Sequence, residues 1–217
     1  MRTPQSPRSA LLPMHRGAAL AGTGMALGTI LTVAMARPAL AVDAAQYGKL
    51  RQGQVVVQNV KPAQNPGAAS AVQATVLIRR PPEQVFTVLR DSENLFKNDP
   101  SFKRVRVVKR LDANTELVEY TLKISPLLPA FVYTNKVAYV PNRASSFKRV
   151  AGSFEQMNGS AQLLPGNKPD ETLFVYTLSL KPGVPVPQGI INGFLGSDLP
   201  RSLKLIQQRV YSRFPNT

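Results

Sequence analysis

The sequence has 217 residues, a formal net charge of +15 at pH 7, one histidine, and no cysteine or tryptophan. This length favours a single domain, and a hydrophobic fraction of 43% is sufficient for a buried core. The absence of cysteine excludes disulfides, a thiolate nucleophile and thiolate-bound zinc or iron–sulfur centres, while the basic charge favours an anionic partner or surface.

Residues 1–41 have the composition of an export signal. They contain four arginines and no acidic residue, an uncharged run from Gly17 to Ala36, and the small-residue end Ala39-Leu40-Ala41. These features are typical of a secretory signal. We therefore predict cleavage after Ala41 and export to a periplasm, or to the thylakoid lumen in a cyanobacterium. Met14 is an alternative start, and an uncleaved anchor is the alternative to cleavage because the apolar run is just long enough to span a bilayer.

Removal of this segment changes the chemistry available to the chain. The only histidine, His15, is lost, and the formal net charge falls from +15 to +11. A chain without His or Cys has no Ser-His-Asp triad and no metal site with imidazole or thiolate ligands. Any general acid–base catalysis would have to use carboxylates, lysine or tyrosine. The sequence thus favours a binding protein over an enzyme and assigns no catalytic residue, metal or cofactor.

The domain is expected to span residues 54–213, after a flexible polar lead-in at residues 42–53. Gln54–Val60 and Ala71–Ile78 have the composition of strands, and the Pro/Gly/Asn-rich segment between them predicts a hairpin. Two short helices should follow, because Pro82 suits a first helical turn and a second helix is predicted around Leu95.

After Pro100 the hydrophobic pattern has a period of two, and turn residues separate the segments. This pattern predicts a meander of antiparallel strands at Val105–Leu111, Glu116–Ile124, Val132–Val140, Ser145–Ser153, Phe154–Leu164 and Thr172–Leu180. In the second strand, Val118, Tyr120 and Leu122 share an apolar face, which another element must cover.

The C-terminal segment that begins at Pro187 provides that cover. Its apolar residues recur at steps of three or four and predict an amphipathic helix of roughly six turns, with a kink near Gly196 and Pro200. The predicted fold class is α+β, with a curved antiparallel sheet wrapped around a long C-terminal helix and short helices after the first strands.

Three stretches of sequence occur in a distinctive order and spacing. They are Ala74–Phe86 with Leu89-Arg90-Asp91, then Val150–Pro165, and then Thr172–Tyr176 followed by Pro185-Val186-Pro187 and the final helix. In these features the chain resembles the START-like (SRPBCC) superfamily, in its polyketide cyclase/dehydrase and coenzyme-Q-binding branch. The resemblance covers about residues 54–213, and Ala161 stands where many members have tryptophan.

The resemblance implies a helix-grip fold with a hydrophobic cavity between the sheet and the long helix. Members of the superfamily bind lipids, quinones, polyketides and other apolar molecules, a minority are enzymes, and they share no single catalytic constellation. We therefore expect an exported, monomeric, non-catalytic protein that binds an apolar small molecule or a lipid. One alternative is a polyketide cyclase/dehydratase-like enzyme, and another is an interaction or assembly factor whose cavity is filled by side chains.

The candidates for the cavity lining are mostly aromatic residues on the predicted strands and apolar residues of the final helix. They are Tyr120, Tyr133, Tyr139, Phe147, Phe174, Tyr176, Ile191, Phe194, Leu195 and Asp198. Ordinary core packing is the alternative for each tyrosine, because strands favour aromatic residues in any case. Asp198 is either a base with a raised pKa or an N-cap for the second half of the helix.

A second group of residues provides candidates for contact with an anionic membrane. It comprises Lys103, Arg104, Arg106, Lys109 and Arg110, together with the Pro-bounded loop tip Leu127 and Leu128. The alternatives are a solvated basic surface and two leucines that turn into the core. Nucleic acid is not expected, because the chain carries an export signal and has no recognisable binding motif.

Overall fold

The computed structural model describes residues 42–60 and 70–215 of the chain. The predicted signal at residues 1–41 and most of the predicted hairpin connection lie outside the described residues.

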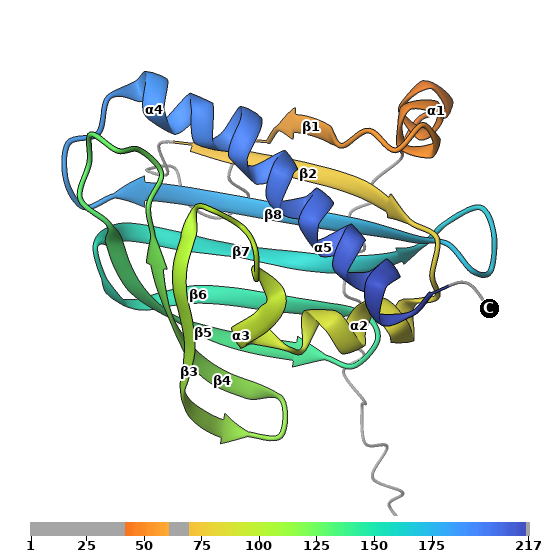
Figure 1. The fold of residues 1–217 in the computed structure, drawn as a ribbon, viewed down its shortest axis with the longest axis horizontal. Helices are drawn as coiled ribbons and strands as arrows, with labels where there is room; N and C mark the ends of the chain where they lie inside the picture. Colours follow the sequence, from red (N-terminus) through yellow and green to blue (C-terminus); the bar gives the residue numbers. More distant parts are fainter. Residues whose placement is uncertain (1–41, 61–69, 216–217) are drawn as a thin grey trace, which may run out of the picture. The chain divides into compact units, whose positions relative to one another are not determined.

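Eight antiparallel strands form one sheet, in the order β1-β2-β8-β7-β6-β5-β4-β3 (Figure 1). The alternating residues that predicted the meander do form it, and the N-terminal hairpin pairs with the last strand along β2 and β8. The strands are β1 (Val56–Asn59), β2 (Ser70–Ile78), β3 (Phe102–Asp112), β4 (Thr115–Leu122), β5 (Phe131–Val140), β6 (Ala144–Gly152), β7 (Phe154–Pro165) and β8 (Thr172–Pro182).

Two short helices carry the chain from β2 at one side of the sheet to β3 at its far edge. They are α2 (Pro82–Leu89) and α3 (Ser92–Leu95), and both were predicted. Pro82 stands in the first turn of α2, where a missing N–H is harmless. The edge strand β3 pairs with β4 through three irregularities of register, which bend and twist that edge.

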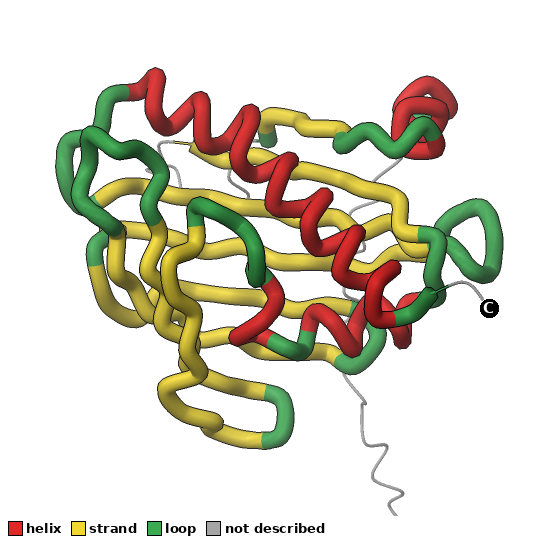
Figure 2. Tube along the Cα trace, viewed as in Figure 1, coloured by secondary structure: helices red, strands yellow, loops and turns green. Residues whose placement is uncertain are grey.

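The C-terminal helix is continuous over 26 residues and runs across one face of the sheet (Figures 1 and 2). It consists of α4 (Gln188–Gly193), a π-helical turn η1 (Phe194–Asp198) and α5 (Leu199–Arg213). The sequence predicted a kink at Gly196 and Pro200. Pro200 has no N–H to donate within the helix, and a π-helical turn, in which the Leu199 N–H bonds to the Phe194 carbonyl, stands just before it.

The flexible lead-in expected at residues 42–53 is instead largely helical, as α1 (Ala44–Arg51). Asp43 and Gln46 form a capping box at its start, in which each side chain bonds to the other's backbone N–H. The helix is attached to the domain, because Leu50 is 1% exposed and the Tyr47 hydroxyl donates a 2.7 Å hydrogen bond to Glu171. This corrects the prediction for the segment.

The core lies between the sheet and the C-terminal helix. Val118, Tyr120 and Leu122 point inward, and Leu203 and Ile206 of α5 lie within the same cluster of buried residues. The predicted cover of the apolar face and the α+β class are thus confirmed. Glu116 occupies the same inward-facing register of β4 as these three residues. It is a carboxylate and yet is only 3% exposed.

Candidate functional site

A cavity of about 50 Å³ lies between the sheet and the C-terminal helix. Its wall is mainly aromatic and aliphatic, with a few polar side chains, and among the residues that the structure describes no charged side chain lines it. The lining residues are Leu89, Ser92, Leu95, Phe96, Phe102, Tyr120, Tyr133, Asn135, Val137, Tyr139, Ser145, Phe147, Met157, Tyr176, Leu178, Phe194, Leu199 and Ser202.

Six of the ten residues proposed from the sequence lie on this wall. They come from four strands and from the π-helical turn of the C-terminal helix, and are Tyr120, Tyr133, Tyr139, Phe147, Tyr176 and Phe194. The inward positions of neighbouring strands bring the aromatic residues of that set together, as the period-two pattern implies.

The other four candidates lie elsewhere. Phe174 is fully buried in the core, Ile191 borders a smaller apolar gap, and Leu195 borders a groove beside β1 and β2. The side chain of Asp198 makes no capping hydrogen bond and pairs with Arg201 at 2.7 Å between Oδ1 and Nη2. Asp198 is not among the residues that line the cavity, and its carboxylate is paired with Arg201.

Three of the four tyrosines of the wall, Tyr120, Tyr133 and Tyr176, form stacked aromatic pairs. Tyr120 and Tyr133 are directly opposite each other on β4 and β5, and their ring centroids are 5.1 Å apart. The rings of Tyr176 and Phe147 are also stacked, with 5.6 Å between their centroids, and the Phe147 ring packs against Gly159. A Cβ atom at Gly159 would lie 2.6 Å from the Phe147 ring and 2.0 Å from a backbone oxygen, so only glycine permits this approach.

The hydroxyls of Tyr120, Tyr133 and Tyr176 make no hydrogen bond to any described residue. Burial raises the pKa of each of these phenols above its usual value. The neighbouring side chain of Asn135 is 4% exposed, and its Oδ1 atom also has no partner among the described residues. The wall thus presents neutral phenol groups and an amide whose hydrogen-bonding capacity is unused.

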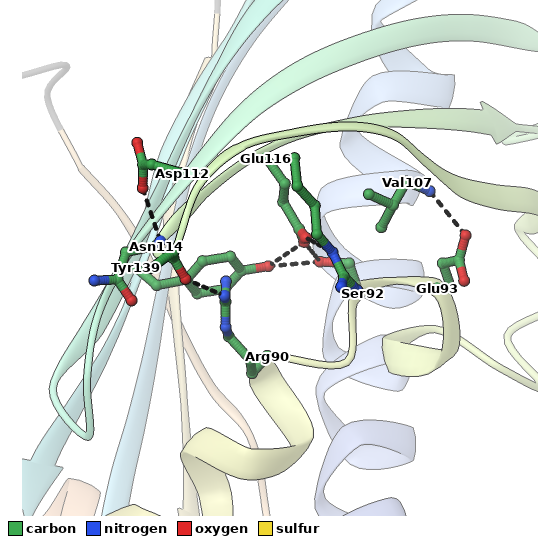
Figure 3. A network of polar contacts seen from close by, with 10 residues as sticks. Arg90, Ser92, Glu93, Val107, Asp112, Asn114, Glu116 and Tyr139 are labelled. Carbon is green, nitrogen blue, oxygen red and sulfur yellow. Dashed lines mark hydrogen bonds and ion pairs between the residues drawn. The ribbon is translucent and has the colours of Figure 1, made fainter.

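Tyr139 differs from these three because its hydroxyl is paired (Figure 3). It donates to Oε1 of Glu116 at 2.9 Å, and the Ser92 hydroxyl donates to the same oxygen. The guanidinium of Arg90 lies over the Tyr139 ring, 4.4 Å from its centroid. Burial is the main cause that raises the pKa of Tyr139. Sequence reasoning missed this network, although Glu116 occupies an inward position of a clearly alternating strand.

A second polar contact joins α5 to the chain ahead of β3. Ser202, on the cavity wall, donates a hydrogen bond to Oδ2 of Asp99, which is 3% exposed. The backbone N–H of Ser101 donates to the other oxygen of Asp99 at 2.9 Å. The carboxylate therefore has partners on both oxygens and holds the helix above the cavity.

The residues proposed for membrane contact lie on one edge strand and one loop. Lys103, Arg104, Arg106, Lys109 and Arg110 are all exposed along β3. Arg106 pairs with Glu119 at 3.2 Å, and Arg110 lies 3.8 Å from Glu116. Leu127 is 86% exposed, whereas Leu128 is partly buried against the core, so only the first leucine of the tip faces solvent.

Among residues 42–60 and 70–215, no group of three or more carboxylates is arranged to hold a metal ion. Within the same ranges, no helix has both the length and the apolarity needed to cross a bilayer.

Comparison with known families identifies the fold. The family described as polyketide cyclase / dehydrase and lipid transport matches residues 78–204. No curated protein matches the sequence.

Three solved structures show the likeness of fold. Human StAR-related lipid transfer protein 5 aligns with a TM-score of 0.59 at 13% identity, over 75% of this chain and 84% of its own. TTHA0849 from Thermus thermophilus aligns with 0.57 at 19% identity, over 66% and 99%. A START superfamily protein from Mycobacterium smegmatis aligns with 0.56 at 20% identity, over 66% and 98%.

Proposed function

Because the chain belongs to the polyketide cyclase/dehydrase and lipid transport family, we propose that it binds an apolar small molecule or a lipid between the sheet and the C-terminal helix, without covalent chemistry. The family description and the name of the human structural neighbour support this class of ligand. The observation that carries the proposal is the set of unpaired polar groups on the cavity wall.

A space filled only for packing would have its polar groups bonded, since buried polar atoms in proteins nearly always have partners. Tyrosine in particular finds a partner for its hydroxyl when it is buried. Three phenols and one amide oxygen around one cavity, none with a partner among the described residues, favour a site that receives another molecule. They therefore favour ligand binding over an assembly factor with a filled cavity.

The cavity must widen to admit such a ligand. Sites for drug-sized molecules have volumes of roughly 300–1,000 Å³, whereas this cavity has about 50 Å³. The helical segment 188–198 is the part best suited to give way. It contains Gly189, Gly193 and Gly196, and apart from chain neighbours and the adjacent backbone of the helix itself, no heavy atom of a described residue lies within 4 Å of a Cβ placed at any of them. Glycine weakens a helix interior, and Phe194 of this segment lies on the cavity wall.

Native mass spectrometry of the gently purified protein tests the proposal. We expect a bound lipid, quinone or pigment in the wild-type protein and its loss in Ser145→Leu, which fills the cavity from β6. Ser146→Leu is the matched control, because Ser146 is exposed on the neighbouring position of the same strand. The proposal fails if no such molecule co-purifies and none raises the melting temperature.

The Tyr139–Glu116 pair supports a second candidate, a cyclase or dehydratase acting on a polyketide-like substrate. The Tyr139 hydroxyl lies on the cavity wall and is bonded to a carboxylate, so proton transfer between the cavity and Glu116 would pass through it. Dehydration of an aromatic β-hydroxyketone, in which an α-proton and the β-hydroxyl leave as water, is followed by the absorbance of the enone. This candidate requires turnover that is lost in Tyr139→Phe while ligand binding remains.

Contact with an anionic membrane remains a proposal that rests on the exposed cations of β3 and on Leu127. Co-sedimentation with phosphatidylglycerol vesicles, compared with phosphatidylcholine vesicles, measures it. Binding to the anionic vesicles alone, weakened by Leu127→Glu and by added salt, is the expected result. Equal retention of the variant and of the wild-type protein would contradict it.

Export is likewise proposed from residues 1–41. The mass of the protein recovered from the periplasm of an expressing bacterium would establish whether cleavage occurs after Ala41. A protein that retains this segment would instead support an anchor.

A further inference from the structure

The polar groups of the cavity wall are concentrated on its sheet side. Tyr120 and Tyr133 lie opposite each other on β4 and β5, Asn135 follows two residues after Tyr133 on the same face of β5, and Tyr176 lies on β8. All four are on the wall, and none of the three hydroxyls bonds to a described residue. A ligand that lies against the sheet would therefore meet several free hydrogen-bonding groups at once.

The charge around the cavity restricts the class of ligand. Within residues 42–60 and 70–215, no charged residue lines the cavity. The carboxylate of Glu116 lies directly behind the wall, where Tyr139 and Ser92 donate to it. A ligand carboxylate would have to lose its hydration with no cation on the wall to replace the water, and it would face a carboxylate of like charge. A neutral ligand avoids both costs.

The protonation of the wall determines what it offers. Burial raises the pKa of Tyr120, Tyr133 and Tyr176, so these phenols keep their protons at physiological pH and donate hydrogen bonds. Their natural partner is an acceptor oxygen such as a carbonyl. The stacked rings of the wall suit a planar, apolar body.

We infer that the cavity selects a neutral, ring-containing ligand with a carbonyl oxygen directed at the hydroxyls of Tyr120, Tyr133 and Tyr176. This inference rests on the proposed function, because it specifies what kind of apolar molecule the same cavity holds. It assigns the selectivity of the cavity to three hydroxyls that make no hydrogen bond within the described part of the chain.

Three probes of nearly the same shape test the inference against the full chain by isothermal titration calorimetry at pH 7. They are 2-acetylnaphthalene, which is a neutral ketone, 2-ethylnaphthalene, which is the hydrocarbon, and 2-naphthoate, which is the carboxylate. We expect the ketone to bind roughly tenfold more tightly than either of the others. The variants Tyr133→Phe and Tyr176→Phe should each weaken ketone binding roughly threefold to tenfold and leave hydrocarbon binding unchanged.

Tyr211→Phe is the control, because the Tyr211 hydroxyl accepts a hydrogen bond from the Arg79 backbone outside the cavity. It should not change the affinity for any probe. Loss of a hydroxyl without a protein partner does not endanger folding, and an unchanged melting temperature of the two cavity variants verifies this.

The possible results separate the inference from the proposed function. If the hydrocarbon or the naphthoate binds as tightly as the ketone, the inferred ligand class is wrong while apolar binding stands. If the ketone binds most tightly but the cavity variants do not weaken it, the assigned hydroxyls are wrong. If none of the three probes binds or raises the melting temperature, the inferred ligand class is wrong, and native mass spectrometry decides separately whether the proposed function stands.

Discussion

The hydroxyl of Tyr139 donates a 2.9 Å hydrogen bond to Oε1 of Glu116, a carboxylate that is almost fully buried beside the cavity. Ser92 donates to the same oxygen, while Arg110 approaches the other oxygen from the surface at 3.8 Å. Among the four tyrosines of the wall, Tyr139 alone makes a hydrogen bond to the rest of the described chain. The stability of the fold should therefore depend on this hydroxyl and not on the other three.

Removal of the paired hydroxyl by Tyr139→Phe should lower the free energy of unfolding by about 1.5–3 kcal/mol, because a bond to a carboxylate is lost in a site with little water. Urea unfolding followed by circular dichroism measures the change. A loss of less than about 0.5 kcal/mol would show that Ser92 alone satisfies Glu116.

The unpaired hydroxyls should behave in the opposite way. Tyr133→Phe and Tyr176→Phe remove no hydrogen bond to a described residue, so each should change the free energy of unfolding by less than about 0.5 kcal/mol or raise it slightly. The same urea titration compares them with Tyr139→Phe. A loss as large as that of Tyr139→Phe would reveal an internal partner, such as tightly bound water.

Stability should fall as the pH rises above about 10, the usual pKa of an unfolded tyrosine. Burial raises the pKa of Tyr120, Tyr133, Tyr139 and Tyr176 in the folded state. Above pH 10 the unfolded chain loses protons that the folded chain keeps, so the free energy of unfolding decreases by up to about 1.4 kcal/mol per pH unit for each tyrosine. Urea titrations between pH 8 and 11 measure the slope.

Tyr133→Phe provides the control for this pH dependence, since it removes the contribution of one phenol and should flatten the slope accordingly. Equal slopes in the variant and the wild-type protein would mean that Tyr133 titrates at its ordinary pKa in the folded state.

Alanine at Gly193 or Gly196 should stabilise the fold by about 0.5–1 kcal/mol, because both positions are helical and a Cβ atom there meets open space. The stiffer helix should also slow the uptake of 2-acetylnaphthalene in stopped-flow tyrosine fluorescence. Gly152→Ala is the contrasting control and should destabilise, since Gly152 has φ of +104° and its Cβ would lie 2.3 Å from the Val132 oxygen. Unchanged uptake in the stabilised variants would indicate access by another route.

Much of the fold follows from local patterns in the sequence. Alternation along β4 specifies which side chains face the helix, and the spacing from Leu199 to Val210 specifies the face that covers them. Two further local signals in the sequence indicate features of the structure. Asp43 and Gln46 stand at the spacing of a capping box ahead of α1, and Glu116 is in step with the inward positions of its strand.

The size of the cavity and the pairing of its hydroxyls follow from contacts between residues far apart in the chain. Ser92 and Tyr139, for example, lie on α3 and β5 and meet only because the intervening strands fold back between them. Periodicity indicates that Tyr133 and Tyr139 both face inward. It does not distinguish the one that finds a carboxylate from the one that does not, because that depends on the packing of side chains in three dimensions.

The bends in β3 have a consequence for the association of one copy of the chain with another. An open sheet edge is a template onto which a further strand can be added. Here the edge is interrupted at three points of its register, and the Val107 N–H already donates to the Glu93 carboxylate at 2.9 Å (Figure 3). The arginines and lysines along β3 would also repel the same strand of a second molecule. The edge is therefore protected against aggregation, and charge-reversal variants of β3 should be examined for self-association before any loss of membrane binding is interpreted.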